Sequence, residues 1–161
     1  MRKYLVCNAK SSIMEKISFN IILESQQDRK EKARLIAEKI KSAKGYSWVG
    51  LYDIKEKEIQ LISFAGRTEP TFTSFPKDKG LNGRAYMEKK TVIVNDIDKD
   101  EDYLLTFSDT QSEIVVPVFD PGGKAVSGTI DVESEQENAF GHEDAVFLEE
   151  CAASIQSLWS K

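Results

Sequence analysis

The chain is poor in the residues that most directly indicate a chemistry. Its 161 residues include only two cysteines, Cys7 and Cys151, and one histidine, His142. Two cysteines are too few for a disulfide scaffold, and a histidine without neighbouring cysteines makes neither a zinc site nor a Cys-His nucleophile pair. No stretch approaches the roughly 20 apolar residues of a membrane span. We therefore expect neither a disulfide-rich protein nor a membrane-spanning one.

An excess of positive charge is also lacking. The chain has 27 acidic and 22 basic residues and a net charge of −5. It therefore has no overall basic field that would attract nucleic acid or an anionic membrane. From the length and composition we expect a single domain over residues 1–161, located in the cytoplasm, with neither nucleic acid nor membrane as a partner.

The most informative segment present is Ser112–Ser134, SEIVVPVFDPGGKAVSGTIDVES. Its centre, Asp120–Gly123, has turn chemistry, and the residues on both sides alternate between apolar and polar as strands do. Successive strand side chains point to opposite faces, so Asp131 and Glu133 share a face, and antiparallel pairing can bring Glu113 next to them. The segment predicts three converging carboxylates; the plainer alternative is a solvated strand face.

The other patterns predict helices and strands in a mixed order. Apolar residues at helical spacing predict a long amphipathic helix between Asp28 and Gly45, with the glycine as its C-terminal cap. We expect further helices over about 12–23, 80–87 and from 142 onward, strands at 46–52, 58–64 and 91–94, and loops at 65–79 and 96–109. This order predicts an α+β fold in which helices pack against one face of an antiparallel sheet.

These segments resemble the GAF domain, a small-molecule-binding sensor module. The resemblance is carried by YSWVGLYDI, KGLNGRAY, SEIVVPV and GTIDVES, and among GAF proteins it is strongest to the free methionine-(R)-sulfoxide reductases. It implies a ligand pocket under loops, on the sheet face opposite the N- and C-terminal helices. It also implies that Trp48 and Tyr52 belong to the pocket, and that Glu113, Asp131 and Glu133 hold the amino group of a ligand.

The chain departs from these reductases at their cysteines. The matching positions are Asn82 and residues near Phe72 and Thr106, none of which is a cysteine. Sulfoxide reduction by the usual route requires a thiolate nucleophile and a second, resolving thiol. We therefore expect no catalytic residue, no metal and no cofactor, and a pocket in which Asn82 offers a polar contact.

Three functions are compatible with these patterns. The first is a stand-alone, non-catalytic sensor domain that binds a small amino-group-bearing molecule. The second is a divergent reductase that uses Cys7 or Cys151, and the third is a protein interaction module with a collapsed pocket, in which Trp48 and Tyr52 are simply core residues. Residues 1–27 would form an N-terminal helix attached to a GAF core over 28–161, and the terminal helices could form a homodimer.

Overall fold

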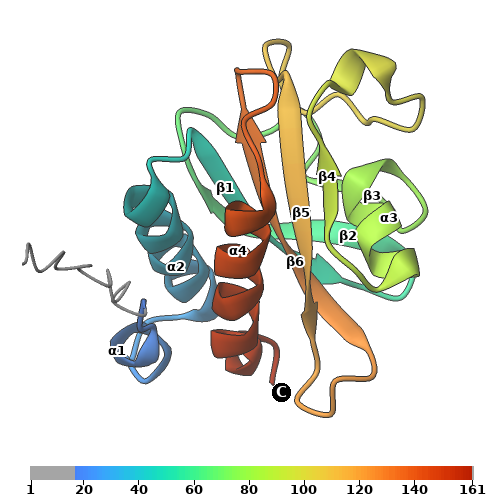
Figure 1. Cartoon of the computed structure of the whole chain (residues 1–161). Helices are drawn as coiled ribbons and strands as arrows, with labels where there is room; N and C mark the ends of the chain where they lie inside the picture. Colours follow the sequence, from blue (N-terminus) through green and yellow to red (C-terminus); the bar gives the residue numbers. More distant parts are fainter. Residues whose placement is uncertain (1–16, 161) are drawn as a thin grey trace, which may run out of the picture.

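A computed structural model of the chain describes residues 17–160, which form one antiparallel sheet with helices on both sides (Figure 1). The strands are β1 (Trp48–Ile54), β2 (Glu58–Ala65), β3 (Ser74–Pro76), β4 (Val92–Val94), β5 (Ser112–Phe119) and β6 (Val126–Ser134). They lie in the order β3-β2-β1-β6-β5-β4. The central strands β1 and β6 therefore join a segment from each half of the chain.

Two helices cover one face of the sheet, called the helix face here. Helix α2 (Arg29–Lys44) packs on β1 and β2, and α4 (His142–Ser154), followed by the short helix η2 (Gln156–Trp159), packs on β5 and β6. The Asp28 side chain accepts a hydrogen bond from the N–H of Glu31 at the start of α2, and Gly45 ends that helix with φ 71°. Both ends of the predicted amphipathic helix are therefore confirmed, along with the α+β architecture.

The main apolar core lies between these helices and the sheet. Its members are fully or almost fully buried, and they include Ala33, Ile36, Ala37, Ile40, Val49, Leu51, Ile114, Ile130, Val132, Leu148, Cys151, Ile155 and Leu158. The apolar stripe of the last helix thus faces the sheet. Since that stripe is occupied within the chain, a homodimer through the terminal helices stays a prediction.

The opposite face, called the pocket face here, is covered by a helix and by loops. Helix α3 (Gly80–Glu88) packs on β5, β6 and β4, while the loop after β2 and the segment around the short helix η1 (Ile97–Lys99) complete the cover. The predicted short helix is present, and the loop predicted over 96–109 contains one 3-10 turn, η1. None of the described helices is long and apolar enough to cross a membrane.

Two expectations about secondary structure need correction. Residues 12–16 of the helix predicted over 12–23 lie outside the described range; among residues 17–23 only Asn20–Leu23 (α1) is helical. This helix was predicted from Ile13, Ile17 and Ile21 at helical spacing, but Ile21 is 87% exposed whereas Phe19 is buried in the main core, so this spacing does not mark a packed helix face. The loop predicted over 65–79 contains β3, whose Phe75 pairs with Ile59 of β2.

Candidate functional site

Three carboxylates meet on the pocket face, where β5 and β6 run side by side. The register places Glu113 opposite Glu133 and Val115 opposite Asp131, so the three acids come from adjacent positions of one surface. One oxygen of each lies within 4.8 Å of the others, and the three residues are only 1–2% exposed. The structure thus brings together the three acids that the strand pattern predicted to converge, and it buries them.

The hydrogen bonds to these acids come from neutral side chains. The Asn82 amide donates to Asp131 Oδ2 at 2.7 Å, while the Thr129 hydroxyl donates to Asn82 Oδ1 at 2.5 Å. The Thr110 hydroxyl donates to Glu133 Oε2. Asp131 Oδ1 and Glu133 Oε1 are buried and have no partner among the described residues. Within residues 17–160, no lysine, arginine or histidine pairs with the three acids.

Burial without a cation changes the titration of all three groups. Desolvation raises the pKa of Asp131 to about 7 and, with the nearby charge of Asp131, raises that of Glu133 to about 8. Desolvation and the charges of the other two acids raise the pKa of Glu113 well above its usual range. A raised carboxyl pKa means that the surroundings disfavour the negative charge, which a bound cation would correct.

Two aromatic side chains of β1 lie beside the acids. Trp48 pairs with Glu133 in the sheet, Gly50 with Asp131, and Tyr52 with Thr129. A Cβ atom on Gly50 would lie 2.3 Å from the Trp48 ring and 3.0 Å from the Tyr52 ring, so only glycine leaves room for both rings above this strand. Tyr52 lines a small cavity with Glu113 and Asp131, whereas Trp48 lines a second one with Glu133; that both are walls of a ligand pocket stays a prediction.

The acids are closed off from solvent by two connected loop segments. Thr71, in the loop after β2, donates from its N–H (3.1 Å) and from its hydroxyl (2.7 Å) to the carbonyl of Thr106. Below them the Trp48 ring packs edge-on against Phe107, with centroids 5.4 Å apart, and Tyr52 packs against Phe75 at 5.8 Å. The remaining cavity is only about 10 Å³, which is room for about one water molecule.

That cavity collects the positions that the family resemblance singled out. Its lining includes Asn82, which matches one reductase cysteine, and Phe72 and Thr106, near which the other two were matched, together with Glu113 and Asp131. These two acids and the three substituted positions therefore belong to one site.

A family model described as "GAF domain" matches residues 26–159. The chain belongs to the GAF domain family. It is 33% identical over 110 residues to GAF domain-containing protein A of Dictyostelium discoideum, covering 68% of this chain and 67% of that protein. It is 34% identical over 112 residues to the free methionine-R-sulfoxide reductase of Saccharomyces cerevisiae, covering 68% of this chain and 61% of that protein, which is less than two thirds of the yeast enzyme.

Solved structures place the fold in the same group. The free methionine-R-sulfoxide reductase of Neisseria meningitidis, solved with its substrate, aligns with a TM-score of 0.77 at 30% identity, covering 88% of this chain and 83% of that one. The type II enzyme of Thermoplasma acidophilum aligns with a TM-score of 0.75 at 31% identity, covering 82% and 95%. The resemblance to this branch of GAF proteins is therefore shown in sequence and in structure.

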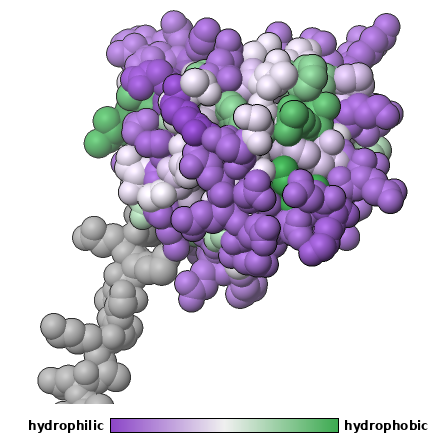
Figure 2. All heavy atoms as spheres, turned by 90° about the horizontal axis from the view of Figure 1, so that it is seen from above, coloured by the Kyte–Doolittle hydropathy of each residue, from purple (hydrophilic) through white to green (hydrophobic). Residues whose placement is uncertain are grey.

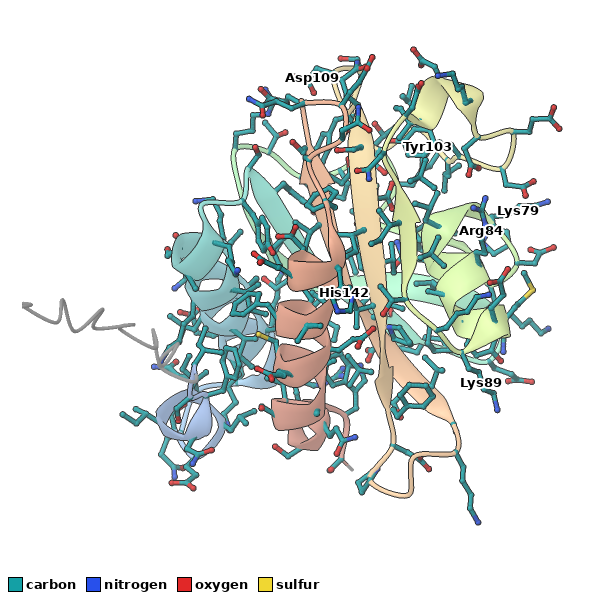
Figure 3. All side chains as sticks on the ribbon, viewed as in Figure 1. Lys79, Arg84, Lys89, Tyr103, Asp109 and His142 are labelled. Carbon is teal, nitrogen blue, oxygen red and sulfur yellow. The ribbon has the colours of Figure 1, made fainter. Side chains whose placement is uncertain are left out.

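The sequence analysis missed several residues at this GAF pocket. Thr110 and Thr129 supply hydroxyl donors, and Tyr103 lies in the segment after η1. Desolvation and then the charges of Glu133 and Glu113 raise the pKa of Tyr103. Figure 3 shows Tyr103 near the edge of the sheet, above Arg84 of α3. Only Thr129 carried a signal, because it lies two residues before Asp131 on the same strand face.

Other candidates lie away from the site. His142 begins α4 on the helix face (Figure 3), and Cys151 lies in the main core, where desolvation raises the pKa of its thiol to about 12. Asp100, in the acidic loop, pairs with Arg84 through two hydrogen bonds of 2.9 and 2.7 Å. In the part of the chain that the structure describes, Glu113, Asp131 and Glu133 are the only group of three acids, cysteines or histidines close enough to hold an ion together.

Proposed function

We propose that this GAF domain is a non-catalytic sensor that binds a small molecule bearing an amino group. One observation carries the proposal: three buried carboxylates converge, two of their oxygens have no partner, and no basic side chain of residues 17–160 compensates them. In this proposal Glu113, Asp131 and Glu133 accept the N–H groups of the ligand. Trp48 and Tyr52 supply apolar walls, and Asn82 orients Asp131.

An ammonium group suits this arrangement for a physical reason. A buried carboxylate is costly unless a cation or several donors compensate it, and charge-assisted hydrogen bonds are about twice as strong as neutral ones. A primary ammonium has three N–H donors, which matches three carboxylates around one point. Asp131 Oδ1 and Glu133 Oε1 are the acceptors that it would satisfy first.

The number and position of the cysteines support the proposal that the domain is non-catalytic. Cys151 is the only cysteine among residues 17–160, and it is buried on the far side of the sheet from the acids. Its raised pKa keeps the thiol protonated, whereas the nucleophile in sulfoxide reduction is a thiolate. Cys7 lies outside the described residues. Turnover of free methionine-(R)-sulfoxide that is lost in Cys7→Ser would favour the divergent reductase instead.

A ligand of this kind requires the cover to move. A cavity of about 10 Å³ holds no amino acid or amine, so residues 66–79 and 96–109 would open to admit one and close over it. The small cavity is also what an interaction module with a collapsed pocket would have. The two functions differ in one respect: only a binding pocket gives the unpartnered carboxylate oxygens a use.

Thermal unfolding with a panel of compounds tests the proposal. The panel contains amino acids, primary alkylamines, both methionine sulfoxide epimers and divalent metal chlorides, each at millimolar concentration. A ligand at 100 times its Kd adds about 2.7 kcal/mol, which raises Tm by roughly 5 to 10 °C in a domain of this size. We expect a shift with amino compounds that disappears in Asp131→Asn and persists in Asp98→Asn, whose carboxylate is exposed. A shift with metal salts alone, or none at all, would contradict the proposal.

A further inference from the structure

The acid cluster has a second approach, on the side away from the cavity that holds Asp131 and Glu113. Glu133 lines another cavity of about 10 Å³, enclosed by Trp48, Phe107, Thr110 and Arg67. This cavity and a groove of about 300 Å³ share four residues, Ser47, Glu133, Ser134 and Glu135. Glu133 and Glu135 both line the small cavity, and the Glu135 side chain is about half exposed, so this cavity leads from the buried cluster toward the surface.

The groove lies at the end of the sheet where α2 finishes and α4 begins, at the top of Figure 1. Hydrophilic residues dominate this end of the molecule when it is viewed from above (Figure 2). Two of the groove's charged residues are Lys44 and Asp144, which offset each other, and Asp144 already accepts hydrogen bonds from the Tyr46 hydroxyl at 2.7 Å and from the N–H of Gly141 at 2.9 Å. The two other charged residues that line the groove, Glu133 and Glu135, are both acids.

A cation already occupies the mouth between the cavity and the groove. The Arg67 guanidinium pairs with Asp109 and, at 2.9 Å, with Glu135. All three side chains are about half exposed, so the guanidinium can leave at little cost. Arg67 therefore marks a position that attracts positive charge and that a ligand cation can take over.

We infer that the ligand class is a linear diamine, which bridges the buried acid cluster and the groove mouth. One ammonium lies among Glu113, Asp131 and Glu133, the methylene chain passes along the Trp48 and Phe107 rings, and the second ammonium replaces Arg67 at Glu135. This inference rests on the proposed function, since it assigns the first ammonium to the same three carboxylates.

Contacts favour a diamine over a monoamine, and charge disfavours a zwitterion. Because the second ammonium replaces Arg67, it keeps a positive charge at Glu135 and adds a second point of attachment that a monoamine lacks. Arg67 is the only basic side chain that lines the two small cavities, and it already faces two acids. The carboxylate of an amino acid would add another negative charge to this set. The aromatic edges suit methylenes, and the ring faces also attract a cation that passes over them.

Calorimetric titration of the full chain with 1,4-diaminobutane and with 1-aminobutane tests the inference. We expect the diamine to bind about tenfold more tightly, the equivalent of one charge-assisted hydrogen bond. Glu135→Gln should remove most of that difference, whereas Glu137→Gln, an exposed acid on the same loop that does not line the groove, should preserve it. Arg67→Gln should tighten diamine binding and leave monoamine binding unchanged, because it removes a competitor for Glu135.

The outcomes separate the two proposals. Equal affinity for both amines, with both lost in Asp131→Asn, would overturn the diamine inference and leave the amino-group site standing. An amino acid that binds more tightly than either amine would also overturn the diamine inference and leave the amino-group site standing. If neither amine nor any amino acid binds, the proposed function itself is wrong, and the diamine inference is wrong with it.

Discussion

The two faces of the sheet are both buried, yet only the pocket face carries a cluster of buried acids among its apolar residues. On the helix face, β5 and β6 carry Ile114, Val116, Val118, Ile130 and Val132, all in the main core. On the pocket face, the same two strands carry Glu113, Asp131 and Glu133 at the alternate positions. Apolar burial on the helix face stabilises the folded state, whereas the buried carboxylates on the pocket face destabilise it.

Two buried aspartates, one on each face of the sheet, differ in whether a cation pairs with them. Asp53 of β1 lies on the helix-face side, where Arg29 donates to both of its oxygens at 2.7 and 2.5 Å and Lys55 pairs with it at 2.8 Å. Burial alone would raise its pKa, but these two cations lower it. Asp131, one strand away, has no cationic partner within residues 17–160. The fold can supply partners for a buried carboxylate, and the partner that Asp131 lacks within residues 17–160 is what the proposed cationic ligand would provide.

The largest effect should come from removing an apolar side chain on the helix face. Ile130 is fully buried in the main core, so Ile130→Ala should lower the free energy of unfolding by about 4 kcal/mol through lost burial and a cavity. Ile93→Ala, at a 37% exposed edge position, should cost less than about 1 kcal/mol. Chemical denaturation measures both. Equal losses would mean that the helix face is not the main source of stability.

The next effect is a pH dependence that arises on the pocket face. Asp131 and Glu133 have raised pKa values in the folded state, about 7 and 8, so between roughly pH 5.5 and 7 the folded state holds protons that the unfolded chain has released. Raising the pH over this window therefore favours unfolding. Each of the two groups contributes up to about 2 kcal/mol, so the ligand-free protein should lose roughly 3 to 4 kcal/mol.

Denaturant titrations at several pH values test this slope. Asp131→Asn should flatten the profile, because one of the groups that hold the extra protons is gone and Glu133 loses a nearby negative charge. A stability that stays constant or rises over the same pH window in the wild-type chain would show that the cluster is ionised and compensated without a ligand.

Local patterns were sufficient to predict every strand except β3 and the convergence of the acids, but they could not predict which segments cover the acids. Alternation along residues 112–134 places Glu113, Asp131 and Glu133 on one face whatever the rest of the chain does, because strand geometry fixes it. Thr110 and Tyr103 reach the cluster only because the 97–111 segment folds back over the sheet, a long-range event without a periodic signal. The isoleucines before residue 23 had such a signal, yet Ile21 is exposed.

The smallest effect compares the two buried aspartates directly. At pH 7, Asp53→Asn should lower the free energy of unfolding by about 1 kcal/mol, because the new amide keeps one acceptor for Arg29 and that guanidinium is exposed enough to be solvated. Because the Asp53 pKa is lowered in the fold, the contribution of Asp53 to stability is present at neutral pH and is lost as the pH falls below the carboxyl range.

Asp131→Asn should not destabilise the ligand-free chain, since an amide removes an uncompensated charge and still accepts from Asn82. Parallel urea titrations of the two variants at neutral and at acidic pH measure the difference. A greater loss at Asp131 than at Asp53 would mean that the pocket-face charge is already stabilised within the chain, and the argument for a cationic ligand would lose its basis.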